Sequence, residues 1–286
     1  MLWFFGRWLI MLSTPACKQG SIILDNKEFF FLAGILGSDH LLGVEDPFQG
    51  RMDEEIADEW HKTKTLLVDK GYLICHKNEV QLSIPPVVFS KVAIACLAER
   101  ACWFKYSVYG ETYESYLHVT NERVVRVCKG NEVATSYKLD DLGTIEEACC
   151  RIMSEIDMQE GSHTDMPALF FSQQHFNELY ERSHVLDVDV LSNKFAEVTD
   201  DIESSISLAK CLKFRSGEGE FHLSKWTGHA WETQQAAFLM NGSVNWLVRR
   251  SLKSDQDWLV ASLTCKDKFQ NMLLMWLKHS SQSDVR

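Results

Sequence analysis

The sequence has few of the residues that keep a chain from folding, and it lacks a hydrophobic run long enough to cross a membrane. Its 286 residues include only 5 prolines and 15 glycines, while 45% are hydrophobic. This composition excludes a disordered, collagen-like or low-complexity protein. The most apolar stretch, Leu2–Leu12, is interrupted by Arg7. It is far shorter than the roughly 20 residues of a membrane-spanning helix and lacks the basic leader of a signal peptide.

Positive charge is also scarce, since 40 acidic side chains outnumber 29 basic ones and the formal net charge is -11. Such a balance repels phosphate backbones, so we expect no nucleic-acid partner. The nine cysteines are an odd number and lie mostly within apolar runs, where a free thiol packs as a small hydrophobe. This usage favours a reducing compartment over a disulfide framework, and we expect a cytoplasmic protein.

The first half of the chain predicts helices, then a meander, then a closing helix. Asp25 and Glu28 form a capping-box pattern before apolar residues at helical spacing, and Gly37 ends that helix. Further helices are predicted over residues 52–70 and from Pro85-Pro86 onward. Strands are then predicted at Trp103–Tyr109, Tyr113–Val119, Arg123–Val127 and Val133–Leu139, followed by a helix over Asp141–Ile156.

The second half repeats this order. It predicts helices at Ser172–Arg182, Ser192–Val198 and Thr199–Lys210, strands at Cys211–Arg215, Glu220–Trp226, Gln234–Met240, Val244–Arg250 and Trp258–Leu263, and a closing helix at Lys266–Lys278. Turns at Asn121-Glu122 and Asn241-Gly242 occupy matching places. We therefore expect an α+β fold of antiparallel meander sheets with flanking helices, in two halves related by a quasi-twofold axis. The sequence leaves open whether the two sheets pair edge to edge.

We divide the chain into a variable N-terminal segment (1–20), a first helical and β-meander half (21–160) and a second such half (161–286). The first half has a Leu-rich helix and an acidic helix that ends at Lys70–Leu73, followed by the meander and its closing helix. This order of elements, which occurs in both halves of the chain, resembles that of the EspG-type chaperones of ESX (type VII) secretion systems. The resemblance implies a central antiparallel sheet and a role in holding a helical secretion substrate soluble in the cytosol.

Catalytic and metal-binding patterns are missing from the sequence. The adjacent Cys149 and Cys150 would point about 100° apart on a helix and cannot chelate one ion. His222 and His229 have no carboxylate or cysteine at ligand spacing beside them. The stretch Gly217-Glu218-Gly219 departs from a dinucleotide-binding loop and predicts a hairpin tip. We expect no enzyme, no cofactor and no metal, with an enzyme of unrecognised type as an alternative.

Aromatic side chains are the remaining candidates for a binding surface. Trp226 and Trp231 flank a glycine-containing stretch without periodicity, and His229 lies between them. Tryptophan is a common anchor of protein interfaces, although these rings can equally pack into a core. We name Trp226, His229 and Trp231 as candidate partner contacts.

Together with the resemblance to EspG-type chaperones, these observations predict a non-catalytic chaperone or adaptor that binds a helical type VII secretion substrate. An immunity protein that blocks a secreted toxin is the main alternative, because an acidic surface suits a basic nuclease. A winged-helix transcription regulator is a further alternative, since the helix over residues 52–70 precedes a predicted hairpin. The acidic start of that helix argues against DNA binding.

Overall fold

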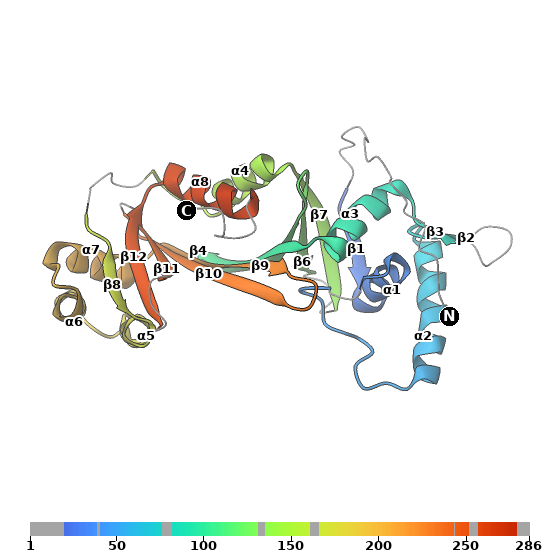
Figure 1. Cartoon of the computed structure of the whole chain (residues 1–286), viewed down its shortest axis with the longest axis horizontal. Coiled ribbons are helices and arrows are strands. Elements are labelled where there is room, and N and C mark those ends of the chain that lie inside the picture. Colours follow the sequence, from blue (N-terminus) through green and yellow to red (C-terminus); the bar gives the residue numbers. More distant parts are fainter. Residues whose placement is uncertain are drawn as a thin grey trace.

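The computed structural model describes residues 20–38, 41–75, 82–130, 135–160, 166–242, 244–251 and 257–278. These residues form eight helices, one ten-stranded antiparallel sheet and one small two-stranded sheet (Figure 1). The α+β class predicted from the sequence is confirmed. None of the described helices combines the length and apolarity needed to span a membrane.

The first half begins with a short edge strand and ends with a helix. Its elements are β1 (Ile22–Asp25), α1 (Asn26–Leu36), α2 (Asp53–Asp69), β2 (Ile74–Cys75), β3 (Leu82–Ser83), α3 (Pro86–Leu97), β4 (Arg100–Val108), β5 (Glu111–Val119), β6 (Val124–Lys129), β7 (Ser136–Gly143) and α4 (Ile145–Glu155). The predicted capping box is present, because the backbone N–H of Glu28 donates to Asp25 Oδ1 at 2.8 Å and the backbone N–H of Asp25 donates to Glu28 Oε2 at 2.9 Å.

The second half follows the same plan with fewer insertions. Its elements are β8 (Leu169–Ser172), α5 (Gln173–Arg182), α6 (Val188–Thr199), α7 (Ile202–Lys213), β9 (Gly217–Trp226), β10 (Trp231–Met240), β11 (Asn245–Arg250), β12 (Trp258–Thr264) and α8 (Lys266–Lys278). Ser172 caps α5 by accepting from the backbone N–H of His175, at the place where Asp25 caps α1.

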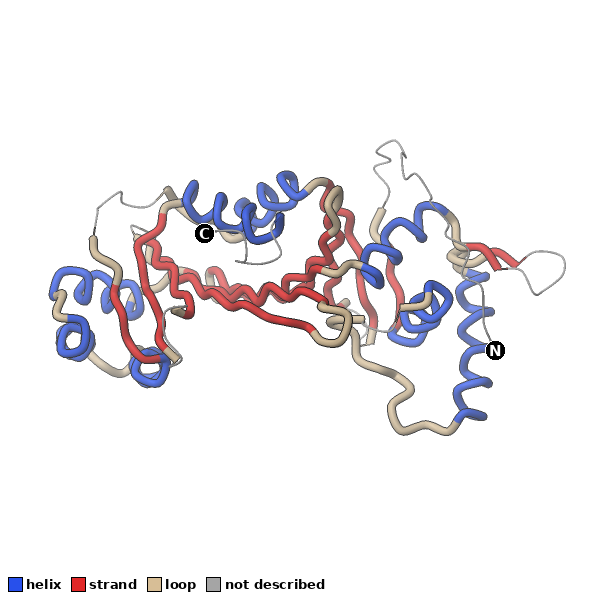
Figure 2. The backbone as a smooth tube through the Cα atoms, viewed as in Figure 1, coloured by secondary structure: helices blue, strands red, loops and turns tan. Residues whose placement is uncertain are grey.

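The strand order shows the quasi-twofold relation directly. The large sheet runs β1-β7-β6-β5-β4-β9-β10-β11-β12-β8, so the strand order of one half reverses that of the other, and the two meet at β4 and β9. Both edges are strands of only four residues. The two halves therefore share one continuous sheet (Figure 2), which removes two edge strands that would otherwise be exposed.

The junction strands are aligned so that two equivalent aromatic residues meet. Phe104 of β4 lies opposite Phe221 of β9, and their rings stack with centroids 4.3 Å apart and an interplanar angle of 6°. Both side chains are buried. They belong to a core in which α4 and α8 cover one face of the sheet, with residues from both halves. We call this face the covered face.

Two further cores lie on the opposite face, one at each end of the sheet. The helices α1, α2 and α3 pack on the first-half strands, and α5, α6 and α7 pack on the second-half strands. Figure 1 shows these helices gathered at the two ends, with α4 and α8 side by side over the middle. Among the described residues, no helix covers the middle of this second face.

Several details of the sequence-based prediction are wrong or incomplete. The predicted strand Cys211–Arg215 is mostly the end of α7, and the helix predicted from Asp141 begins only at Ile145 because residues 141–143 extend β7. The edge strands β1 and β8 were not predicted. Their four residues are too short to show a clear alternation. The helix predicted near Ser192–Val198 begins earlier, at Val188.

The stretch Gly217–Gly219 is not a hairpin tip but the start of β9. A Cβ on Gly219 would lie 2.4 Å from the Phe238 ring, and a Cβ on Gly217 would lie 2.5 Å from Met240 Cε. The glycines are therefore explained by close packing against side chains of β10. Part of the boundary between the halves, residues 161–165, and the segment 1–19 lie outside the described residues.

Replacing Phe221 by alanine tests the junction. The side chain is 0% exposed and also contacts Phe269, with ring centroids 5.5 Å apart. We expect Phe221→Ala to lower the free energy of unfolding by about 3–5 kcal/mol, because the cavity would lie in a core that both halves share. Urea denaturation measures this loss. The exposed neighbour Glu220 is the control, and equal effects of Glu220→Ala and Phe221→Ala would contradict the assignment.

A buried histidine makes the stability depend on pH. His118 of β5 is 1% exposed, its Nε2 has no hydrogen-bond partner, and burial lowers its pKa to about 4. Between pH 4 and the ordinary histidine pKa near 6.5, the unfolded chain binds the proton and the folded chain does not. The free energy of unfolding therefore falls as the pH drops through this window, by about 2 kcal/mol from about pH 7.5 to about 5.

Urea denaturation at about pH 7.5 and at about pH 5 measures this dependence. We expect the wild-type chain to lose about 2 kcal/mol more than His118→Leu between the two pH values. The exposed His229 supplies the matched control, because His229→Leu should keep the wild-type dependence. If the wild type and His118→Leu lost the same amount, His118 would not be the titrating group.

Candidate functional site

The uncovered middle of the sheet is the candidate functional site. Because side chains alternate along a strand, Phe104 and Phe221 point to the covered face while Trp103 and His222, opposite each other on β4 and β9, point away from it. We call the surface formed by these outward residues and their neighbours on β5 and β10 the open face. It lies between the two end groups of helices.

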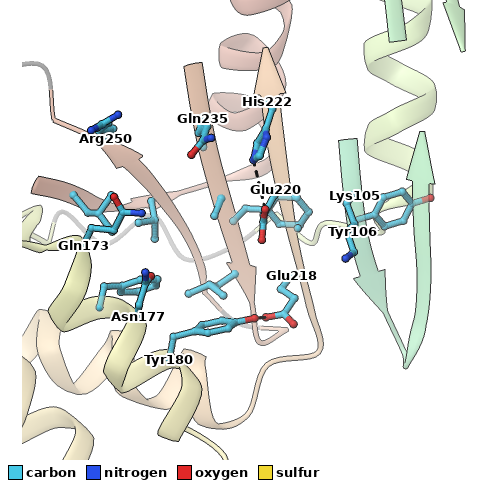
Figure 3. A pocket seen from close by; sticks show the side chains of 18 of the residues that line it. Lys105, Tyr106, Gln173, Asn177, Tyr180, Glu218, Glu220, His222, Gln235 and Arg250 are labelled. Atoms are coloured by element: carbon cyan, nitrogen blue, oxygen red, sulfur yellow. Dashed lines mark hydrogen bonds and ion pairs between the residues drawn. The ribbon is translucent and has the colours of Figure 1, made fainter. Parts of the chain in front are cut away.

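A pocket of 590 Å³ opens on the second-half side of this face. Its floor comes from residues of β4, β9, β10, β11 and β12, and α5 forms one wall with Gln173, Phe176, Asn177 and Tyr180 (Figure 3). The volume falls in the range of protein ligand sites. Its lining mixes aromatic, amide and charged groups.

The wall of the pocket is fixed by a contact between helix and strand. The Tyr180 hydroxyl donates to Glu218 Oε2 at 2.7 Å, and Arg215 Nε lies 2.9 Å from the same oxygen. The Arg215 guanidinium also lies over the Tyr180 ring, 5.1 Å from its centroid. Burial and the hydrogen bond to Glu218 raise the pKa of Tyr180, so it stays a neutral donor. These contacts hold α5 at a set distance from β9.

The centre of the open face carries an aromatic and ionisable cluster. The rings of Trp103 and His222 have centroids 4.5 Å apart, and Trp103 Nε1 donates to Glu114 Oε1 at 2.9 Å. His222 Nε2 lies 3.5 Å from Glu220 Oε2, so the expectation that His222 has no carboxylate beside it is wrong. Figure 3 shows His222 and Gln235 side by side on neighbouring strands, above Glu220. The cluster presents both donors and acceptors beside an aromatic ring.

The predicted contact residues Trp226, His229 and Trp231 all lie at the tip of the β9–β10 hairpin. Trp226 and Trp231 are direct partners across the hairpin, with ring centroids 5.5 Å apart at 53°. Both are half-buried, while His229 lies exposed in the turn. The alternation that places His222 on the open face places both tryptophans there too. The structure thus brings the two tryptophans together at one end of the open face.

The backbone holds this tip against the first half of the molecule. The backbone N–H of Trp226 donates to the Glu99 carbonyl at 2.7 Å, just before β4. The tip itself is closed by the N–H of Thr227, which donates to the Ala230 carbonyl at 3.0 Å. The open face therefore runs from the tryptophan pair at one end to Tyr180 of α5 at the other.

Sequence reasoning missed the pocket residues. Lys105, Glu220, His222 and Gln235 sit at alternate positions of strands that lie in the middle of the sheet. A polar face on a central strand signals an uncovered surface. These polar positions indicate an uncovered surface only when β4 and β9 are known to be central strands rather than edge strands.

Cys149 and Cys102 are both buried in the core shared by the two halves. Burial raises the pKa of Cys149 and Cys102 to about 12, which keeps both thiols protonated. Within the described ranges, no group of three or more His, Cys, Asp or Glu side chains is placed to hold a metal ion.

The helix α2, weighed as part of a DNA-binding module, and its neighbour α1 carry paired charges. Glu59 accepts from both Lys27 and Lys62, and these bonds lower its pKa to about 2. Lys70 pairs with Glu28. These three lysines are thus matched by carboxylates instead of forming a basic stripe.

Of the comparisons with known proteins, the one with solved structures finds a match. No family model matches the sequence, and no curated protein matches it. Among solved structures, the chain is similar to the Mycobacterium tuberculosis type VII secretion system chaperone EspG5, solved in complex with the PE25-PPE41 dimer. The two are 10% identical, with a TM-score of 0.58 over 91% of this chain and 95% of that one. This likeness covers both halves and shows that the chain has an EspG-like fold.

Proposed function

We propose that this chain is a non-catalytic chaperone or adaptor that binds a helical type VII secretion substrate on its open face. The observation that carries the proposal is the uncovered centre of the sheet, which bears aromatic anchors among polar groups. Trp103, Trp226 and Trp231 lie on this face, and Tyr180 borders its pocket. Tryptophan and tyrosine dominate the binding energy of protein interfaces, and polar groups around them give specificity.

The dimensions of the open face suit a helical partner. From Glu218 to Trp226 the strand β9 extends about 26 Å at about 3.3 Å per residue. The four strands β5, β4, β9 and β10 span about 14 Å across, at about 4.8 Å between neighbours. A helix is about 10–12 Å in diameter, so one helix, or the end of a helical hairpin, fits between the two end groups of helices.

The structural neighbour supports the same class of function. EspG5 is a secretion chaperone seen in complex with a protein dimer, and the fold it shares with this chain includes both halves of the sheet. Covering a partner's surface needs no reactive side chain. The proposal therefore includes no catalytic step, cofactor or metal, and it places the protein in the cytoplasm, where a substrate is held before export.

The alternative functions receive less support from the charges. An inhibitor of a basic toxin needs a dense acidic patch, whereas Lys105 lies opposite Glu220 on the open face. A DNA-binding regulator needs an unpaired basic stripe, whereas Lys27, Lys62 and Lys70 near α2 are matched by carboxylates.

Removing the tryptophan pair tests the proposal. We expect the double variant Trp226→Ala/Trp231→Ala to capture at least about tenfold less partner than wild type, because two interface anchors are lost. Its melting temperature should change by only a few degrees, since both rings are half-buried at a hairpin tip. The measurement is capture by the tagged full chain from the native cytosol, quantified by mass spectrometry.

A matched control lies on the opposite side of the sheet. Met275 of α8 is 57% exposed, and Met275→Ala should leave capture unchanged. Recovery of a helical protein with secretion signals, lost in the tryptophan variant, supports the proposal. Recovery of a toxin catalytic domain would favour an immunity protein instead. A large loss of melting temperature with unchanged capture would assign the tryptophans to the fold.

A further inference from the structure

The quasi-twofold axis relates strand positions of the second half to counterparts in the first half. Phe104 and Phe221 lie at the axis, and the strand registers extend the correspondence outward from them. Tyr116 and Val127 are paired in β5 and β6, as Ala237 and Val248 are in β10 and β11. Lys129 and Tyr137 are paired in β6 and β7, as Arg250 and Leu259 are in β11 and β12. The residues of the second half in these two comparisons all line the pocket: Ala237, Val248, Arg250 and Leu259.

The first-half copy of this site is filled by the chain itself. Residues 41–45, between α1 and α2, cross it, and Leu41 and Val44 pack against the first-half core. Gly43 lies so close to Tyr116 that a Cβ there would be 2.5 Å from the ring, and its φ of +83° favours glycine. We call residues 41–45 the plug segment.

Two polar contacts lie at the end of the plug segment. The Tyr137 hydroxyl accepts from the backbone N–H of Glu45 at 3.2 Å, and Lys129 Nζ lies 3.0 Å from Glu45 Oε1. Three of the four counterpart residues in the first half therefore contact the plug segment: Tyr116, Lys129 and Tyr137. The segment covers the first-half equivalent of the pocket with an apolar stretch that ends in a carboxylate.

The second half has no equivalent of the plug segment among the described residues. Residues 183–187 alone connect α5 to α6, whereas residues 37–52 connect α1 to α2. Ala237 also stands where the first half has Tyr116, which leaves room above the sheet. Arg250 keeps the positive charge of Lys129, and it pairs with Asp257. Since these two side chains are 66% and 63% exposed, their ion pair is weak and exchangeable.

We infer that the pocket binds a loop of the protein partner, and that the residues of this loop are similar in type to those of the plug segment. An apolar side chain would occupy the place of Gly43 and fill the space above Ala237. An acidic side chain two residues later would take the place of Glu45 and pair with Arg250. This inference rests on the proposed function, because it takes the occupant to be a segment of a protein. It adds that the partner carries an apolar residue and an acidic residue at this spacing.

Synthetic peptides of residues 40–50 serve as the probe. The test peptide carries Gly43→Phe, and the control peptide carries Glu45→Lys in addition, each labelled with fluorescein. Binding to the full-length chain is followed by fluorescence anisotropy at low salt, where charge pairing is strongest. We expect the wild-type chain to bind the test peptide at least about fivefold more tightly than the control peptide. Arg250→Glu should reverse this preference, and Ala237→Tyr should weaken binding of the test peptide at least about tenfold.

Arg249 provides the matched control for charge. It is also exposed on β11 but points to the opposite face of the sheet, so Arg249→Glu should leave the peptide preference as in wild type. Circular dichroism confirms that each variant is folded. Absence of saturable binding to the wild-type chain, or equal effects of Arg249→Glu and Arg250→Glu, would overturn the inference.

Sedimentation of the same proteins tests whether a second copy of this chain occupies the pocket. A wild-type dimer that becomes a monomer on Ala237→Tyr would assign the pocket to a second copy of this chain and overturn the inference. A negative result of the peptide experiment can be distinguished from a failure of the proposed function. If partner capture depends on Trp226 and Trp231 while the peptides do not bind, the chaperone proposal stands and only the partner's loop chemistry is wrong.

Discussion

The pairing of β4 with β9 is the contact on which the rest of this structure depends. It turns two meanders into one sheet and places Phe104 against Phe221 in a core shared by both halves. Because α4 and α8 pack over the same face of this junction, the other face is left to the helices at the two ends. Those helices do not reach the middle. The open face is therefore a direct consequence of joining two equal halves edge to edge.

The two halves are alike in plan but differ at the pocket. The first half fills its copy of the pocket with residues 41–45, held by Tyr137 and Lys129. The second half has a short connection at that place, and Ala237 replaces the ring of Tyr116. The duplicated plan thus leaves the second-half pocket open where the first-half copy is filled. The pocket, the Trp103–His222 cluster and the tryptophan pair lie on one continuous surface that a single partner can cover.

The sequence predicted most of the elements, because their signals are local. The capping box at Asp25 and the turn at Asn241-Gly242 depend on neighbouring residues alone. Trp226 and Trp231, named from the sequence as candidate contacts, lie together because they pair across one hairpin. The pocket was not predicted, because Lys105 joins His222 and Gln235 only through the β4–β9 pairing, a contact between distant parts of the chain. The edge strands β1 and β8 were missed for a related reason, as only their partners β7 and β12 define them.

The claim that the open face is the binding surface can be tested by footprinting the tryptophans of the full-length chain. Hydroxyl-radical labelling, followed by mass spectrometry, reports the solvent exposure of each side chain with and without the captured partner. We predict that the partner protects Trp103, Trp226 and Trp231 on the open face and leaves Trp276 and Met275 of α8 labelled as before. Protection of α8 with unchanged labelling of the three open-face tryptophans would contradict the account.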